Sequence, residues 1–479
     1  MLRAKSAVFL GISLWLFTAL MARTVESSSL PRVSVQGQRL NDDVGRQVIL
    51  RGVNAGGRSK LPPFNPFEVS PDYETALNRY ADAIADLGFN LVRLLVMYEA
   101  AEPVRGHYDE EYLARYDRLV QAFSRRGIYV IVDAHQDLFS RRFYGDGFPD
   151  WALREKDRDR KQRADSKMWM PRYFTGPVAR SFDRFWSDTE GVQESYAEFF
   201  GMLARRYAQE PAVIGFEPMN EPFVGYWGTL HYSKWYEERL YPFYEKVAQA
   251  VHAADPRFLI FADICPVENP GLWNSQRPRP KIDNLVFSPH YYNLGTYGTP
   301  RPPEKERAVM RQGLRKHQAQ AQFWDTPMVV TEYGVSPLRR NAQAYIASLY
   351  AVFDEMQLSG AFWEASFSPI VINHEDTSLF DPDGSVRPGT PYLDRPYPRA
   401  VAGAIQAFSF QPESGRFELS WKEGGASGPT VIYLPRRVYP QEPQVQMEPG
   451  GKFRWDPGTR TLNLDPLEPG ADRRVVITP

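Results

Sequence analysis

The stretch Ile214-Gly-Phe-Glu-Pro-Met-Asn-Glu-Pro222 carries the first signal of the fold, and Met328-Val-Val-Thr-Glu-Tyr-Gly334 repeats it. In each, a short run rich in β-branched or aromatic residues is followed by a glutamate. Such a run is typical of a buried parallel strand near its carboxyl end. In a closed barrel of parallel strands, the carboxyl ends meet at one mouth, where active sites are built. We therefore expect Glu221 and Glu332 to face each other.

Strand-like runs alternate with amphipathic stretches along most of the chain, which indicates βαβ units. Apolar residues recur in these stretches at three- and four-residue spacing, as on one face of a helix. Eight units predict a (β/α)8 barrel; the alternative is a doubly wound open sheet, although no Gly-rich phosphate loop opens a first βα unit. The expected strands are Val48–Val53, Leu91–Val96, Tyr129–His135, Val213–Glu217, Phe258–Ile264, Asn284–Tyr292, Met328–Glu332 and Gly360–Ser366.

The pattern changes after residue 403. From Ala404 onward, short alternating segments are separated by Gly, Pro and Asp, which predicts a small antiparallel β-sandwich. We expect a barrel over residues 30–403 and the sandwich over residues 404–479. The sandwich either binds sugar or caps and stabilises the barrel.

The N-terminal residues 1–29 have the layout of an export signal followed by a linker. Arg3 and Lys5 precede an apolar stretch from Ser6 to Ala22, and a Ser-rich polar stretch follows it. The alternative is an uncleaved anchor, because the run approaches the roughly 20 residues that a spanning helix needs. Both alternatives predict a secreted or cell-envelope protein.

Charge and cysteine content narrow the function classes. The 57 Lys and Arg residues nearly cancel the 58 Asp and Glu residues, which argues against a nucleic-acid partner. The single cysteine, Cys265, lies in an apolar run and is expected to be a buried hydrophobic residue. Neither a metal nor an organic cofactor is expected, since His135 and Asp137 have no third ligand at zinc-like spacing.

Polar side chains follow most of the expected strands at their carboxyl ends. Two carboxylates facing each other there provide what glycoside hydrolysis needs: an acid that protonates the leaving oxygen and an anion that meets the anomeric carbon. The residues therefore predict a retaining β-glycosidase, although acids at strand ends also serve as structural ion-pair partners. The polar residues are Asn54, Lys60, Arg93, His135, Asp137, Asn220, Glu221, His290, Tyr292, Glu332, Trp363 and Glu364.

The ordered set formed by Arg93, His135, Asn220-Glu-Pro222, His290-Tyr-Tyr292, Glu332 and Trp363 resembles glycoside hydrolase family five. The resemblance implies that Glu221 is the acid/base and Glu332 the nucleophile. It also implies that Asn220 binds the sugar 2-hydroxyl, that Tyr292 holds the nucleophile and that Arg93 keeps Glu332 ionised.

Further segments are similar to the endoglycoceramidase-type members of that family, which cleave between a glycan and ceramide. The resemblance implies that Lys60, His135 and Asp137 line the sugar site. It also implies a glycolipid substrate, met at a membrane surface, and leaves the oligomeric state open. The similar segments are Ser59-Lys-Leu-Pro-Pro-Phe64, Ala134-His-Gln-Asp-Leu-Phe-Ser140, Pro149-Asp-Trp-Ala152 and Tyr397-Pro-Arg-Ala-Val-Ala-Gly403.

Two features separate this chain from that subgroup: the polar lead-in Phe216-Glu-Pro-Met219 and a long, charged connection from Gln136 to Glu190. In the connection, Met168-Trp-Met170 either cradles an apolar aglycone or packs the connection's own core. A cellulase- or mannanase-like endoglycosidase acting on a β-linked polysaccharide is the alternative function. A barrel that binds sugar without cleaving it is a further alternative, which the presence of both glutamates disfavours.

Overall fold

The computed structural model describes residues 30–162, 169–272, 276–293, 301–373 and 375–479. The expected export signal and Met168 lie outside the described residues. Among the helices that are described, none has the length and apolarity to cross a bilayer.

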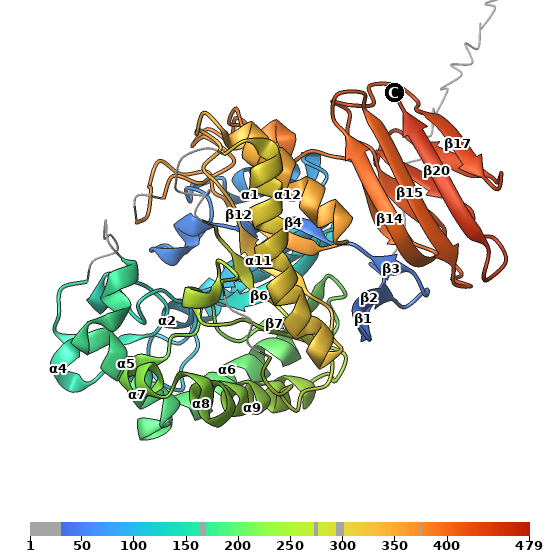
Figure 1. The fold of residues 1–479 in the computed structure, drawn as a ribbon. Helices are drawn as coiled ribbons and strands as arrows, with labels where there is room; N and C mark the ends of the chain where they lie inside the picture. The colour runs from blue at the N-terminus through green and yellow to red at the C-terminus, as the bar shows by residue number, and fades with distance from the viewer. Residues whose placement is uncertain (1–29, 163–168, 273–275, 294–300, 374) are drawn as a thin grey trace, which may run out of the picture.

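Nine parallel stretches make up the eight strands of the expected barrel. Figure 1 shows helices around these strands. β9 (Leu285–Phe287) and β10 (His290–Tyr291) are two halves of one barrel strand, because β9 pairs with β8 and β10 pairs with β11. The ring closes where β12 pairs with β4. The remaining strands are β4 (Arg51–Ala55), β5 (Leu91–Val96), β6 (Tyr129–Ala134), β7 (Val213–Glu217), β8 (Leu259–Ala262), β11 (Val329–Tyr333) and β12 (Ser359–Ala365).

The helices connect and surround the barrel strands. α3 shows why they form where they do: the Asp109 side chain accepts a hydrogen bond from Tyr112 N at 2.9 Å, and Leu113, Tyr116 and Val120 make a buried face. The helices are α1 (Tyr73–Asp86), α2 (Tyr98–Ala101), α3 (Glu110–Ser124), α4 (Glu155–Arg158), α5 (Gly176–Trp186), α6 (Val192–Tyr207), α7 (Gly225–Leu230), α8 (Tyr232–Trp235), α9 (Tyr241–His252), α11 (Pro303–Trp324) and α12 (Ala342–Glu355).

Two antiparallel sheets form the C-terminal part of the molecule, and the N-terminal strands join one of them. β3 pairs with β13 through Val48 and Ala400, so the expected first strand, Val48–Val53, is divided between this sheet and the barrel. Where the barrel domain ends along the chain stays a prediction. The sheets contain β1 (Val33–Gln36), β2 (Arg39–Asp42), β3 (Gln47–Val48), β13 (Tyr397–Val401), β16 (Thr430–Tyr433), β19 (Thr461–Leu464) and β18 (Phe453–Asp456), and β14 (Gly403–Gln411), β15 (Arg416–Glu423), β20 (Asp472–Thr478) and β17 (Gln444–Glu448).

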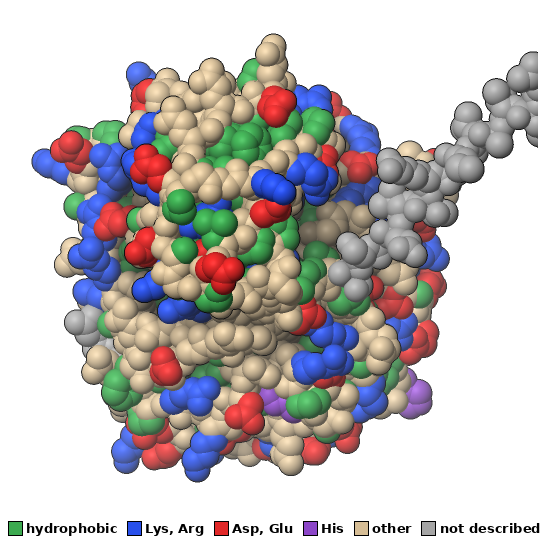
Figure 2. Space-filling view, turned by 90° about the vertical axis from the view of Figure 1, so that its right-hand side faces the viewer, with side chains coloured by type: hydrophobic (Ala, Val, Ile, Leu, Met, Phe, Trp, Pro, Cys, Tyr) green, Lys and Arg blue, Asp and Glu red, His purple; other side chains and the backbone are tan. Residues whose placement is uncertain are grey.

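The C-terminal sheets contact the end of the barrel opposite its mouth. Arg51, where β4 begins, and Arg395 both bind the carboxylate of Asp354, at 2.9 and 2.8 Å. The Tyr397 hydroxyl donates to the carbonyl oxygen of Gly88, which precedes β5, at 2.9 Å. This position favours a bracing role over sugar binding beside the mouth. Figure 2 shows acidic and basic side chains interspersed over one face, in keeping with the balanced composition.

The long connection after β6 is folded rather than extended. It contains α4, the short helical segment Met170–Phe174 and α5. Its aromatic side chains pack on each other: the Phe139 and Phe148 rings stack at 4.1 Å, and Phe182 meets Phe139 edge-on at 5.2 Å. This small core positions Trp169 at the barrel mouth.

Candidate active site

Arg93 organises the centre of the barrel mouth. It lies on β5, is fully buried, and its planar guanidinium binds groups from several strands at once. It donates to Glu217 at 2.7 Å, to Glu332 at 2.6 Å and to Asn220 at 2.9 Å. Because a guanidinium has fixed geometry, these contacts hold Glu332 on β11 and Asn220 after β7 in defined positions. Glu217 lies inside the barrel beneath them.

Glu221 and Glu332 face each other above Arg93. One carboxylate oxygen of each and a ring nitrogen of His290 all lie within 4.8 Å of one another. Retaining glycosidases place their two carboxyl groups roughly 5–5.5 Å apart, whereas inverting enzymes leave room for a water molecule at roughly 6.5–9.5 Å. Oxygens within 4.8 Å of each other leave less room between the two groups than the inverting spacing, which agrees with a retaining pair. Tyr292 donates to the second oxygen of Glu332 at 3.0 Å.

The surroundings of the two glutamates determine which of them is protonated. Burial, together with the nearby charge of Asp137, raises the pKa of Glu221 to about 7. Burial also raises the pKa of Glu332, but the positive charge of Arg93 opposes this effect. Burial lowers the pKa of His290 to about 3, so its ring is neutral at neutral pH. A protonated Glu221 therefore faces a Glu332 that Arg93 stabilises as the anion.

The backbone at Glu221 is held in an uncommon conformation. Its φ of 43° lies in the left-handed region, which residues other than glycine seldom adopt. The Gln136 side chain donates to the carbonyl oxygens of Asn220 and Glu221, at 2.8 and 3.1 Å. The Asp263 carboxylate accepts from the backbone N–H of Glu221 at 2.7 Å. These contacts turn the carboxyl group toward the mouth.

Next to the pair, a charged and aromatic group forms the polar side of the site. The ammonium group of Lys60 lies 2.5 Å from Asp137 and 4.5 Å from the centre of the Trp363 ring. Trp363 also stacks on His135, with ring centres 5.3 Å apart. An ammonium, a carboxylate and a flat indole are groups that bind the hydroxyls and the apolar faces of a sugar ring.

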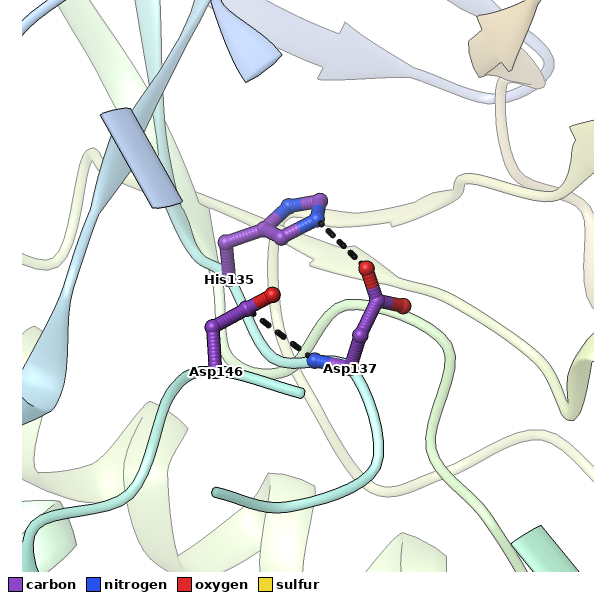
Figure 3. A group of neighbouring side chains, drawn as sticks. All are labelled: His135, Asp137 and Asp146. Carbon is purple, nitrogen blue, oxygen red and sulfur yellow. Dashed lines mark hydrogen bonds and ion pairs between the residues drawn. The ribbon is translucent and has the colours of Figure 1, made fainter. Parts of the chain in front are cut away.

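Asp146 completes a cluster that the sequence analysis did not find. His135 Nε2 lies 3.8 Å from the Asp137 carboxylate, and the Asp146 carboxylate accepts from Asp137 N at 3.1 Å. Both contacts are drawn in Figure 3. The cluster has metal-ligand chemistry, but the cation that it holds is the ammonium group of Lys60. Burial alone lowers the pKa of Lys60, yet Asp137 and Asp146 raise it above its ordinary value. Lys60 is therefore charged.

A cavity of about 220 Å³ opens above these residues. Of the side chains named in the sequence analysis as catalytic or substrate-binding, Lys60, His135, Asp137, Asn220, Glu221, Tyr292, Glu332 and Trp363 line it. Arg93 and His290 are fully buried and support it from beneath. Four apolar side chains, Trp169, Met170, Pro266 and Pro270, form another part of its wall. Polar and apolar side chains therefore line one cavity that also contains the glutamate pair.

Residues 44–368 match the model of the family described as Cellulase (glycosyl hydrolase family 5), and residues 395–477 match the family 5 C-terminal domain. The chain belongs to glycoside hydrolase family 5. Among similar proteins, endoglycoceramidase I of Rhodococcus hoagii is 27% identical and covers 91% of this chain and 86% of its own length. An endoglycoceramidase of Cyanea nozakii is 26% identical over 83% of this chain and 82% of its own.

Solved structures agree with this membership. Endo-glycoceramidase II from Rhodococcus sp., in a complex with ganglioside GM3, superposes on this family 5 chain with a TM-score of 0.78. It is 27% identical and covers 93% of this chain and 100% of its own. A second structure of that enzyme, described as a lactosyl-enzyme intermediate, gives a TM-score of 0.74 at 27% identity, covering 92% of this chain and 99% of its own. This chain is thus a glycoside hydrolase with the family 5 fold.

Sequence reasoning missed several residues of this family 5 site. It assigned no polar group to the fifth strand, where the structure places Asp263 against Glu221, and it overlooked Asn269, which donates to Glu221 at 2.6 Å. It also overlooked Glu375, which accepts from the Trp169 indole at 2.8 Å and lines the cavity with it. Asp263 ends an expected strand, so its position was a usable signal. Asn269 and Glu375 lie in connections, whose path the strand pattern does not define.

Proposed function

We propose that this family 5 hydrolase cleaves, with retention, the bond between the glycan and the ceramide of a glycolipid. The observation that carries this proposal is the cavity: the two facing carboxyl groups lie in one cavity that is lined by polar groups and by apolar side chains. The similarity to endoglycoceramidases, one of them in complex with a ganglioside, supports this substrate class.

In the proposed first step, a Glu332 oxygen attacks the anomeric carbon while Glu221 gives its proton to the glycosidic oxygen. The ceramide hydroxyl leaves and a glycosyl ester forms on Glu332. Esterification removes the negative charge of Glu332, so the pKa of Glu221 falls and its carboxylate becomes a base. Glu221 then deprotonates a water molecule, whose oxygen replaces Glu332 on the anomeric carbon. Asn220, held by Arg93, is placed to bind the 2-hydroxyl.

We propose that different residues of the cavity bind the sugar and the lipid of the substrate. Lys60, Asp137 and Trp363 would bind the sugar, while Trp169 and Met170 would contact the lipid next to the cleaved bond. A cellulase-like activity on β-linked polysaccharides is the second candidate, because the matching family model is described as a cellulase. An open polysaccharide groove would carry sugar-binding groups on both sides of the pair.

A substrate panel separates the two candidates. The protein is incubated with lactosylceramide and GM3 in detergent, and separately with β-glucan and β-mannan oligosaccharides, and the products are identified by mass. We expect intact oligosaccharide and ceramide from the glycolipids. Chain shortening of the polysaccharides with no ceramide release would refute the proposal in favour of the second candidate.

Activity on a glycolipid should follow a bell-shaped pH profile. Below the pKa of Glu332, which burial raises above the ordinary glutamate range, the nucleophile is protonated and activity is lost. Above the pKa of Glu221, about 7, the acid has lost its proton and activity falls again. The dependence of kcat/KM on pH measures both limbs as constants of the coupled pair. Activity that still rises above pH 9 would contradict this assignment.

Replacing Trp169 with alanine should impair lipid-linked substrates selectively. Its indole lines the cavity and packs edge-on against Tyr173 at 6.1 Å. Loss of an aromatic contact in a binding site commonly weakens binding by about 2 kcal/mol, roughly thirty-fold. We expect a loss of this size in kcat/KM on lactosylceramide and a much smaller one on a soluble aryl lactoside.

Trp227→Ala is the matched control, because Trp227 is a partly buried indole on α7 that packs on His231 at 4.8 Å. It should affect both substrates alike. If Trp169→Ala lowered kcat/KM equally on both substrates, Trp169 would only pack the connection, and the proposed contact with the lipid would be contradicted.

We also propose that the protein is exported and meets its glycolipid at a membrane surface. The basic residues Arg3 and Lys5 before the apolar stretch Ser6 to Ala22 support export. An amphiphilic substrate that resides in a membrane would bring the cavity mouth to that surface.

A further inference from the structure

An asparagine in the segment after β8, Asn269, contacts the carboxyl group of the acid/base, Glu221. Asn269 is 4% exposed, and its amide nitrogen lies 2.6 Å from Glu221 Oε1. His290 Nδ1 approaches the same oxygen at 2.9 Å. An amide nitrogen can only donate, whichever ring nitrogen of His290 carries the hydrogen. Oε1 is therefore the accepting oxygen of Glu221, and the other oxygen carries the transferable proton.

A second set of contacts fixes the segment that bears Asn269. The carboxylate of the preceding residue, Glu268, accepts from Tyr232 at 2.6 Å and from Tyr236 at 2.8 Å. The Arg277 guanidinium binds both oxygens of Glu268, at 2.6 and 3.1 Å, and lies 3.6 Å from the centre of the Tyr236 ring. We call these four residues the Glu268 clamp.

The clamp is anchored to neighbouring elements. Tyr236 begins a π-helical turn, Tyr236–Leu240, which is a feature often found near functional sites. On the other side, Gln320 of α11 exchanges hydrogen bonds with the backbone of Arg277, at 2.9 and 3.1 Å. The segment cannot shift without breaking several buried hydrogen bonds, so the distance from Asn269 to Glu221 is fixed by the fold.

We propose that Asn269 is a positioning residue for the acid/base, which directs the transferable proton to one oxygen of Glu221 and stabilises the carboxylate left behind. A donor on Oε1 favours the ionised form. Without it, burial would hold the proton on Glu221 too firmly for efficient release to the leaving group. The same hydrogen bond would support Glu221 when it acts as the base in the second step. The proposal rests on the acid/base role given above.

Several other groups also set the charge state of Glu221, and a substitution at Asn269 leaves them in place. They come from different elements packed around the carboxyl group, so an effect of the substitution is assignable to the amide. The groups are Lys60, Arg93, Asp137, Tyr173, Asp263, Cys265, His290, Glu332 and Glu375.

The test measures the pKa of Glu221 directly. Protein labelled with [δ-13C]glutamate is titrated by NMR, and the Glu221 signal is assigned as the one that E221Q removes. In Asn269→Leu, which keeps the volume and removes the donor, the pKa should rise by about one unit, the size expected for a hydrogen bond to a charged group. In Asn269→Asp, a second carboxyl group at this distance should raise the pKa of the pair further.

Gln193→Leu is the matched control: it removes a buried amide on α6 that donates to the carbonyl oxygen of Phe185 at 2.6 Å and belongs neither to the clamp nor to the site. It should lower thermal stability and leave the pKa of Glu221 in place. An unchanged or lowered pKa in Asn269→Leu would overturn the proposal, and if that variant does not fold, the unshifted titration of Asn269→Asp would do so.

Kinetics give an independent readout. The basic limb of kcat/KM on an alkyl β-lactoside should move upward by the same amount in Asn269→Leu, while a dinitrophenyl lactoside, which needs no acid, should show no such movement. The NMR titration requires no substrate. A failure of the glycolipid panel therefore remains distinguishable from a failure of this proposal.

Discussion

Glu332→Gln is expected to lower kcat by about 10⁴-fold or more on every glycoside, including activated aryl glycosides, because an amide cannot form the glycosyl ester. Losses of this size accompany removal of a catalytic nucleophile. The amide oxygen can still accept from Arg93, which donates to Glu332 Oε1 at 2.6 Å, and the amide nitrogen can donate to the Tyr292 hydroxyl, which lies 3.0 Å from Oε2. The variant should therefore fold and bind sugar, which separates lost chemistry from lost structure.

Turnover of a dinitrophenyl lactoside, measured beside thermal unfolding, checks this expectation. Glu364→Gln is the control: Glu364 is a buried glutamate near the mouth that accepts from Gly57 N at 2.5 Å and Ser366 at 2.6 Å. It should retain most of the activity. A Glu332→Gln enzyme with near-normal turnover would remove Glu332 from the nucleophile role.

Glu221→Gln should give a loss that depends on the leaving group. With lactosylceramide, whose leaving alkoxide needs a proton, we expect kcat/KM to fall by about 10³-fold, within the range of general acid catalysis. With a dinitrophenyl leaving group the first step needs no acid and should recover. Because the glutamine cannot activate water, the glycosyl-enzyme should accumulate, and azide, which needs no base, should speed its breakdown.

The two substrates are compared in the same variant, with the pH profile of lactosylceramide hydrolysis, which needs the acid, recorded for both enzymes. The basic limb should disappear in the variant when the first step limits the rate. Equal losses on the two substrates, or a basic limb that stays in place, would assign the proton to another group. Burial of Glu221 and its pKa of about 7 make it the expected carrier.

The barrel could be predicted because each of its strands is a local signal. A parallel strand that is buried on both faces needs a continuous apolar run, and all six residues of β5 and of β6 are buried. The chain therefore had to contain such runs at regular spacing. The first strand was placed too early, because Val48 and Arg51 belong to one continuous run in the sequence. In the structure, Val48 pairs with β13 and Arg51 pairs with β12.

Contacts between segments that are far apart in the sequence could not be predicted from either segment alone. β3 and β13 are separated by about 350 residues, so neither strand signals its partner. The same holds for Glu268 and its clamp, in which the tyrosines come from the helical stretch after β7 and the arginine from the stretch after β8. Tyrosines and an arginine in such stretches are common, and only their convergence on one carboxylate distinguishes them.

The sequence by itself determined the chemistry at the carboxyl ends of the strands, because strand order in a (β/α)8 barrel follows chain order and brings those ends to one mouth. That rule placed Glu221, Glu332 and their polar neighbours together. The family resemblance assigned the proton to Glu221, and only the tertiary structure gave the physical reason, since the pKa of Glu221 depends on burial and on Asp137. The tertiary structure also decided that Asn269 reaches Glu221, because a connection takes its path from side-chain contacts across the fold rather than from a repeating pattern.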